Sequence, residues 1–251
     1  MSWFHINALA IAWIIIALLL IPVQLKIIAP YGRHSNDRWG LMIDNKTGWI
    51  IMEIISPLIL GFILFATPNL SSSIWIIAGF WMLHYFNRSI IFPLRLNTVG
   101  KKMPLLIALF ALFFNLVNAS LNACYLSSFN ELYTWAWFTD PRFIIGSLIF
   151  LTGAAINIQS DNILLKLRKP GEKGYKIPQG SLFKYISCPN HFGEIIEWLG
   201  FAVLCWNLPA LSFFVWTAAN LIPRALAHHS WYLEKFSDYP GERKAVIPFI
   251  L

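Results

Sequence analysis

Long apolar runs separated by short polar connections restrict the fold of this sequence more than any other feature. A helix needs roughly 20 mostly apolar residues to cross the hydrocarbon core of a bilayer. Runs of this kind occur at residues 4–23, 48–66, 74–92, 103–122, 143–165, 191–207 and 209–227. Backbone groups in lipid must be hydrogen-bonded within their own segment, and no run alternates like a barrel strand. The sequence therefore predicts an all-α integral membrane protein with seven transmembrane helices.

The composition agrees with this interpretation. Hydrophobic residues make up 57% of the 251 residues and charged residues only 12%, far from the balance of a soluble globular protein. No internal repeat or linker divides the chain, so we expect one domain over residues 1–251. The first run has no basic segment before it and no small-residue cleavage site after it, so we expect it to remain as a membrane helix.

Lysine and arginine are concentrated in every second connection, and this predicts the orientation of the chain. The cationic segments lie at residues 26–46, 95–102, 166–184 and 235–244, whereas the opposite side carries only Arg142. Because cytoplasmic loops are enriched in these residues, we expect the N-terminus outside and the C-terminus in the cytosol. The formal net charge of +7 follows from this topology, so we expect no nucleic-acid partner, and nothing indicates a protein partner.

Polar residues inside the expected helices are the candidates for function. A charged side chain at membrane depth costs at least ~2.5 kcal/mol on insertion scales. In the expected topology the following residues share the cytosolic half of the bilayer: Glu53, His84, Tyr85, Asn87, Arg88, Asn157, Asp161, Glu194, Glu197, Asn220 and Arg224, with His228, His229 and Tyr232 just beyond. Any one of them could be an interfacial anchor. Together they predict one pocket, open toward the cytosol.

Helical spacing places several of these residues on shared faces, since residues three or four apart point the same way. The sets are Asn157 with Asp161, Asn190 with Glu194, His84 with Arg88, and Arg224 with His228 and Tyr232. We expect each set to point into the pocket together.

Neither a disulfide framework nor a metal site is predicted. The three cysteines, Cys124, Cys188 and Cys205, are an odd number without ligand spacing. The adjacent His228 and His229 have no acidic or cysteine partner at a spacing typical of zinc ligands.

The charges around the expected pocket indicate the kind of ligand. Acids lie in the helices, while residues 166–184 carry six cations and one acid. Carboxylates accept hydrogen bonds from ribose hydroxyls or a carboxamide, and Arg and Lys bind phosphate oxygens. This layout favours a nicotinamide dinucleotide, with a 2′-phosphate facing the cations. No G-x-G-x-x-G follows a strand, so a Rossmann unit would not hold it.

Long motifs of the chain resemble the steroid 5-alpha-reductase family (3-oxo-5-alpha-steroid 4-dehydrogenases), with the type 2 enzyme nearest. They include "GWIIMEIISP" (48–57), "LHYFNRSIIFPLR" (83–95), "NIQSDNILLKLRKPGEKGYKIPQGS" (157–181) and "HHSWYLEKFSDYPGERKAVIPFIL" (228–251). The resemblance implies a seven-helix membrane reductase. Its reaction would be the NADPH-dependent reduction of the delta-4 double bond of a 3-oxo-steroid, with hydride delivered to C5 to give a 5-alpha-dihydro product.

The resemblance also implies roles for individual residues. Glu53 and Tyr85 match the pair that engages the C3 carbonyl of the substrate. The cofactor-binding positions of the family fall on Asn157, Asp161, Arg168, Tyr175, Asn190, Glu194, Arg224, His228 and Tyr232. Lys176 stands where the type 2 enzyme has arginine. We expect Glu194 to accept from a carboxamide or ribose, and Glu197 to brace a neighbour such as Arg224.

Three alternatives stay open at this point. One is a membrane methyltransferase that uses S-adenosylmethionine, like the isoprenylcysteine carboxyl methyltransferases, although a smaller cofactor would leave the cations of residues 166–184 without phosphates. Another is a carrier, although repeats and broken helices typical of transporters are not evident. The third is a reductase of another enone lipid. Substrate and bilayer are the partners we expect.

Overall fold

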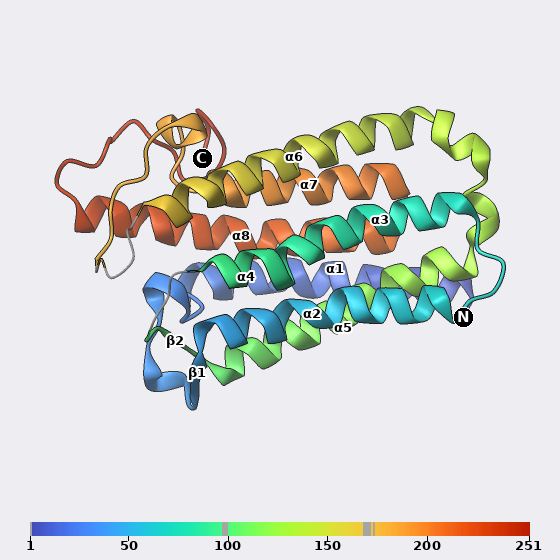
Figure 1. Cartoon of the computed structure of the whole chain (residues 1–251), viewed down its shortest axis with the longest axis horizontal. Helices are drawn as coiled ribbons and strands as arrows, with labels where there is room; N and C mark the ends of the chain where they lie inside the picture. The colour runs from blue at the N-terminus through green and yellow to red at the C-terminus, as the bar shows by residue number, and fades with distance from the viewer. Residues whose placement is uncertain (1, 97–99, 168–171, 173) are drawn as a thin grey trace.

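Long helices lie side by side along one axis of the molecule (Figure 1). This computed structural model describes residues 2–96, 100–167, 172 and 174–251. The long helices are α1 (Trp3–Lys26), α2 (Asn45–Phe65), α3 (Ser72–Phe86), α5 (Leu105–Ser128), α6 (Pro141–Lys166), α7 (Pro189–Cys205) and α8 (Leu208–Lys235). Helix α3 continues through a π-helical turn (Asn87–Ile91) into the short α4 (Phe92–Arg95). The helices fall where the apolar runs predicted them.

Five of these helices are long and apolar enough to cross a membrane by length and composition: α1, α2, α5, α6 and α8. The other two, α3 and α7, have 15 and 17 residues. Helix α3 gains length only because the π turn and α4 extend it. The mostly helical, multi-pass membrane architecture is thus supported, while seven complete spans remain a prediction.

The two ends of the bundle differ in what connects the helices. Figure 1 shows the C-terminus at one end, together with residues 27–44, the segment around 100–104, residues 174–188 and residues 236–251. The N-terminus lies toward the other end, where shorter connections join α2 to α3, α5 to α6 and α7 to α8. We call the first of these the loop end. All the long connections with polar character therefore gather at one end.

Small elements organise the connections. At the loop end, strands β1 (Met42–Asp44) and β2 (Lys102–Pro104) pair antiparallel, with Met42 opposite Pro104. Short 3-10 helices occupy Gly32–His34, Asp37–Trp39, Asn130–Leu132, Trp135–Thr139 and Ser181–Lys184. Side chains of Ser2, Asp44, Ser71, Asp140 and Asn207 accept backbone N–H bonds at the starts of five long helices. These caps satisfy donors that the first helical turn leaves unpaired.

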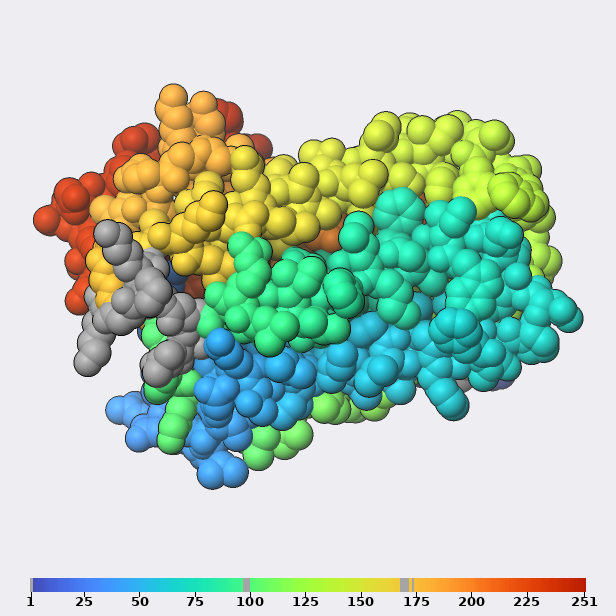
Figure 2. Space-filling model, viewed as in Figure 1, coloured from blue at the N-terminus to red at the C-terminus, as the bar shows by residue number. Residues whose placement is uncertain are grey.

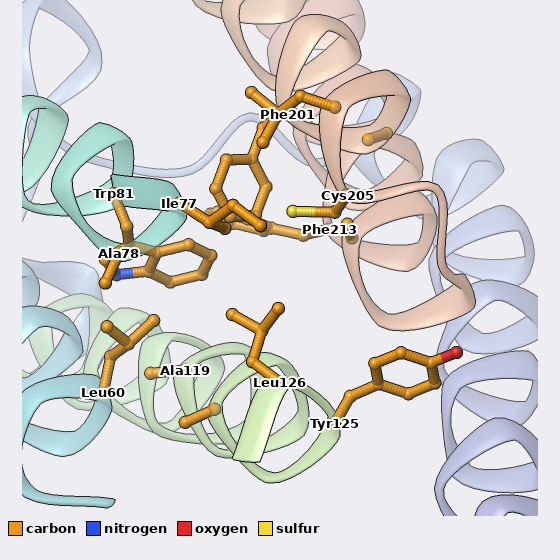
Figure 3. Close-up of a cluster of buried hydrophobic side chains, with 14 of the residues drawn as sticks. Leu60, Ile77, Ala78, Trp81, Ala119, Tyr125, Leu126, Phe201, Cys205 and Phe213 are labelled. Atoms are coloured by element: carbon orange, nitrogen blue, oxygen red, sulfur yellow. The ribbon is translucent and has the colours of Figure 1, made fainter. Parts of the chain in front are cut away.

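A large apolar cluster fills the centre of the bundle. Figure 3 shows Trp81 of α3 pointing between Phe213 of α8 and the side chains of α7, with α2 and α5 below. The Trp81 ring centroid lies 5.1 Å from that of Trp198 and 5.0 Å from that of Phe213. On the face shown in Figure 2, α3 lies between α2 and α6. This core holds α3 against four other helices.

Glycines let α6 and α7 approach very closely. A Cβ added to Gly146 would lie 2.8 Å from the carbonyl oxygen of Gly200, and one added to Gly153 would lie 2.6 Å from that of Gly193. The glycines recur every seven residues on both helices, so they face one another twice. Small residues at such contacts are typical of membrane helix pairs. The contact brings Asn157 on α6 against the first turns of α7.

Candidate active site

Tyr85 and Glu53 are joined by a third side chain, Asn115, and the three residues come from α3, α2 and α5. The Tyr85 hydroxyl donates to Asn115 Oδ1 at 2.8 Å. Asn115 Nδ2 donates to Glu53 Oε2 at 3.4 Å. Tyr85 is 2% exposed and Asn115 is 4% exposed, so the phenol and the amide lie inside the bundle. The two residues predicted to act on a carbonyl group therefore belong to one buried hydrogen-bonded unit.

A second polar group, which we call the ion-pair cluster, consists of Arg88, Asn157, Asp161 and Glu194. Arg88 Nη1 donates to Asp161 Oδ2 at 3.1 Å, and Arg88 Nη2 lies 3.9 Å from Glu194 Oε2. Asn157 Nδ2 donates to the backbone carbonyl of Asn190 at 3.0 Å and to Glu194 Oε2 at 3.4 Å. The cluster thus places one cation against two carboxylates where the π turn after α3, α6 and α7 meet.

Glu197 braces a neighbour, as expected, but that neighbour is His84 and not Arg224. Its Oε1 lies 3.0 Å from His84 Nδ1, and both side chains are buried. Glu197 projects from α7 toward α3, whereas Arg224 on α8 reaches the loop that follows α1, where it donates to the backbone oxygens of Ala29 and Tyr31. A void of about 10 Å³ beside His84, Glu197 and Asn157 has roughly the size needed for one water molecule.

A third group lies at the loop end, and we call it the cationic cluster: Arg33, His34, Arg224, His228 and Tyr232. The Arg224 guanidinium carbon lies 3.4 Å from the centroid of the Tyr31 ring. Arg33 Nη2 donates to the Tyr232 hydroxyl at 3.2 Å, and its guanidinium carbon lies 4.5 Å from the Tyr232 ring centroid. Aromatic faces can attract cations in this way. The cluster therefore holds its cations against rings and carbonyls.

Histidines complete the cationic cluster. His34 Nε2 and His228 Nδ1 lie 2.9 Å apart, with their rings stacked at 5.0 Å. The His191 ring of α7 lies 5.6 Å from that of His228. Burial, together with the nearby positive charges of Arg224 and Arg33, lowers the pKa of His34 to about 4. His34 is therefore neutral at neutral pH.

The cationic cluster has spare hydrogen-bonding capacity. Among the described residues, no carboxylate lies within ion-pair distance of Arg33 or Arg224. Two buried nitrogens, Arg33 Nη1 and His191 Nδ1, have no hydrogen-bond partner within that same part of the chain. Buried polar atoms are normally paired, so unpaired ones need an explanation. Both nitrogens lie near the loop end of the bundle.

The remaining predicted positions lie around this cluster. The Tyr175 ring lies 5.8 Å from the Arg33 guanidinium carbon and 5.0 Å from Lys101 Nζ. Lys176 pairs with Glu172, so its charge is partly compensated. Arg168 lies outside the described residues. A separate hollow of about 350 Å³ lies between residues 179–184 and 240–243, and it contains none of the predicted site residues.

Comparison with known proteins gives the family. The model of the 3-oxo-5-alpha-steroid 4-dehydrogenase family matches residues 101–251. The chain is 43% identical over 235 residues to steroid 5-alpha-reductase DET2 of Gossypium hirsutum, covering 88% of each chain. The chain belongs to this family.

Animal members are about as similar. The 3-oxo-5-alpha-steroid 4-dehydrogenase 1 of Bos taurus is 42% identical over 236 residues, covering 91% of each chain. The human enzyme of the same name is 42% identical over 224 residues, which is 88% of this chain and 85% of the relative. The family resemblance seen in the motifs is thus confirmed. A greater likeness to the type 2 reductase than to these type 1 members remains a prediction.

Three residues at these sites were not among the positions predicted from the sequence: Asn115, Arg33 and His191. A signal for Asn115 was present, because α5 carries buried asparagines at 115, 118 and 122 in an otherwise apolar run. His191 is one residue after the selected Asn190. Arg33 lies in a three-residue 3-10 helix within a long connection, which is too short for periodicity to indicate which way a side chain points.

Proposed function

We propose that this reductase-family protein reduces the delta-4 double bond of a 3-oxo-steroid with NADPH, adding hydride at C5 to give the 5-alpha-dihydro product. The observation that carries the proposal is the buried unit of Tyr85, Asn115 and Glu53. A phenol and a carboxyl group on separate helices converge there within an apolar bundle. Such donors can form hydrogen bonds with the oxygen of an enone, whereas lipid chains offer them no acceptor.

The residues at the loop end fit an anionic dinucleotide. Arg33 and Arg224 have no carboxylate partner among the described residues, and Arg33 Nη1 is buried without a hydrogen bond. Arg guanidinium groups bind phosphate strongly through parallel N–H bonds. The positions proposed to hold the cofactor are Asn157, Asp161, Arg168, Tyr175, Asn190, Glu194, Arg224, His228 and Tyr232, to which we add Arg33.

The two polar clusters divide this task by chemistry. The cationic cluster supplies donors for phosphate and hydroxyl oxygens. The ion-pair cluster supplies the oxygens of Asp161 and Glu194 and the amide of Asn157, which suit a carboxamide or a ribose. The ion-pair cluster adjoins the proposed catalytic unit along the chain, because Tyr85 ends α3 and Arg88 lies in the π turn that follows it. The proposed order from the loop end inward is therefore phosphates, ribose and the reacting ring.

The proposed mechanism uses the residues as follows. A reduced nicotinamide would supply the hydride. Attack at C5 moves negative charge through C4 to the C3 oxygen, and the Tyr85 hydroxyl aimed at that oxygen lowers the barrier by stabilising this charge. Glu53, held by Asn115, would orient the carbonyl in its protonated form, as a second donor to the same oxygen. The enolate then takes a proton at C4 to give the saturated ketone, so the product gains one hydride and one proton.

The topology follows from the same proposal. Those proposed cofactor residues that the structure describes lie in the half of the bundle nearer the loop end, and most of the described lysines and arginines lie there too. We place this end in the cytosol and the N-terminus outside, with seven spans in which α3, its π turn and α4 cross as one helix. The exposed apolar faces of the helices would contact lipid, from which a steroid could enter.

Turnover by the purified protein in detergent tests the proposal. NADPH consumption is followed with and without progesterone or testosterone, and the products are resolved by mass and configuration. We expect steroid-dependent consumption and a 5-alpha product heavier by two hydrogens. Tyr85→Phe, which removes only the hydroxyl, should lower kcat about 100-fold or more and leave NADPH affinity unchanged. Normal turnover by this variant would remove Tyr85 from the mechanism.

Two further outcomes would change the assignment of function. NADPH binding without turnover of either steroid would favour a reductase of another enone lipid. Stabilisation by S-adenosylmethionine and not by NADPH, measured as a shift in thermal unfolding, would contradict the reductase proposal and favour a methyltransferase.

A further inference from the structure

We propose that Asn115 is a positioning residue of the active site, whose side-chain amide fixes Tyr85 and Glu53 relative to each other. This inference rests on the proposed function and extends it to a residue on a helix, α5, that contributes no other proposed site residue. The role of Asn115 depends on which end of its amide faces which neighbour.

A backbone carbonyl fixes the orientation of the amide. Asn115 Nδ2 donates to the carbonyl oxygen of Met52 at 2.7 Å, which is a short and well-formed hydrogen bond. A carbonyl oxygen can only accept, so turning the amide over would place two acceptors against each other in a buried site. The nitrogen must therefore face Met52 and Glu53, and the oxygen must face Tyr85. Asn115 therefore cannot donate to Tyr85 while it accepts from Glu53.

The fixed amide in turn fixes the direction of the Tyr85 hydroxyl. A phenol has one proton, and Asn115 Oδ1 accepts it at 2.8 Å. The hydroxyl proton therefore points toward Asn115, and the phenol oxygen keeps only acceptor lone pairs for other neighbours.

This arrangement has a consequence for catalysis. In the free protein, Asn115 Oδ1 takes the single proton that the proposed mechanism needs at the substrate oxygen. Binding of a ketone replaces one acceptor with another by rotation of the O–H bond alone, while the phenol ring, packed 5.3 Å from Trp81, stays in place. Asn115 therefore orients the Tyr85 hydroxyl before substrate binds. Its amide oxygen competes with the substrate ketone for the hydroxyl proton less strongly than a carboxylate would. Through its bond to Glu53 Oε2, Asn115 also holds the Glu53 carboxyl group at the other end of the same amide.

Substitution at Asn115 with a matched control on the same helix tests the inference. Asn115→Leu removes both functions of the amide, and Asn115→Asp keeps the acceptor for Tyr85 but loses the donor to Met52 and Glu53. Asn118→Leu is the control, because Asn118 is equally buried but bonds to Trp13 and to the backbone of Phe114. The measurements are kcat and KM for steroid, NADPH affinity and the thermal unfolding midpoint, all in detergent.

The expected pattern separates positioning from structure. Asn115→Leu should lower kcat about 100-fold, the size expected from misplacing a reacting group by about 1 Å, with KM and NADPH affinity close to wild type. Asn115→Asp should not recover this loss, because its carboxylate competes for the Tyr85 proton and sets an acceptor against Met52 and Glu53. Asn118→Leu should lower the unfolding midpoint and leave kcat unchanged.

Clear outcomes would overturn the inference. Normal kcat in folded Asn115→Leu, or an equal fall of kcat in Asn118→Leu, would reduce Asn115 to a structural residue. If Asn115→Leu fails to fold, the shorter Asn115→Ser takes its place, and normal kcat there has the same meaning. A wild-type protein without steroid turnover would instead refute the proposed function on which the inference rests, and this result needs no Asn115 variant to be recognised.

Discussion

The ion-pair cluster and the cationic cluster lie in the same half of the bundle, yet they satisfy their charges differently. In the first, Arg88 is bonded to Asp161 and lies near Glu194, so protein groups compensate its charge. In the second, Arg33 and Arg224 rest on aromatic rings and backbone oxygens, with no described carboxylate within ion-pair distance. The first cluster can therefore form without a ligand, whereas the second accumulates positive charge that an anion would relieve.

This difference shows how a small membrane protein can use one group of charged residues for stability and another for ligand binding. A buried charge with a protein partner contributes to holding helices together, and removing one member leaves the other uncompensated. A cation held by rings and carbonyls contributes less to the stability of the fold. Its positive charge remains available to attract an anionic ligand. Substitution of one arginine from each cluster should therefore give opposite patterns of stability and affinity.

The largest effect on stability is expected for Arg88→Met. This change leaves Asp161 and Glu194 without their cation inside the bundle, which should destabilise the fold by about 3–5 kcal/mol. The measurement is thermal unfolding in detergent without ligand. Arg95→Met is the control, because Arg95 bonds to Asn162 at an exposed position. Equal midpoints for the two variants would contradict the view that the ion-pair cluster holds α6 and α7 against the segment that follows α3.

A smaller effect, on affinity and not on stability, is expected for Arg224→Gln. Glutamine keeps a donor for the carbonyl oxygens of Ala29 and Tyr31 but loses the charge. Hydrogen bonds to charged groups contribute about 1.5–3 kcal/mol, so NADPH affinity should fall roughly 10-fold to 100-fold. Titration of NADPH binding at two salt concentrations measures this, and the variant should also show a weaker dependence on salt. Unchanged affinity together with a large loss of stability would reverse the assignment of the two clusters.

The comparison also shows which parts of the molecule the sequence could predict. Apolar runs located the helices, and the spacing of Asn157 with Asp161 and of Asn190 with Glu194 predicted residues that do lie together. These inferences succeed because helical periodicity and membrane thickness are local properties. The order in which helices pack is not local. The packing order of the helices brings Glu197 into contact with His84 and not with Arg224, and this order depends on where glycines permit close contact.

Irregular segments were harder still to predict. Tyr31 and Arg33 follow α1 in a loop without periodicity, and only the folded chain brings them against Arg224 and Tyr232. The π turn at Asn87–Ile91 is likewise a departure from regular helix geometry that the apolar pattern does not encode. Turns of this type often occur near functional sites. Here the turn carries Arg88 into the ion-pair cluster.

The smallest effect concerns pH and the histidine of the cationic cluster. Burial, with help from Arg224 and Arg33, lowers the pKa of His34 to about 4 from an unfolded value of 6.5. Between these values the unfolded chain binds a proton that the folded protein does not, so stability should fall as pH decreases from 6.5 to 4. Above 6.5 both states are neutral at this residue, and the contribution disappears.

His34→Gln isolates this contribution, since glutamine does not titrate. The difference between the unfolding midpoints of wild type and variant is followed from about pH 7 to pH 4, and the wild type should lose more stability across this range. The effect should be modest because His34 is only half-buried and solvent screens its charge. Adding NADPH sharpens the comparison: phosphate beside the cluster would favour protonated His34, so the difference between the two proteins should shrink when the ligand is bound. A difference that NADPH leaves unchanged would mean that the anion binds away from the cationic cluster.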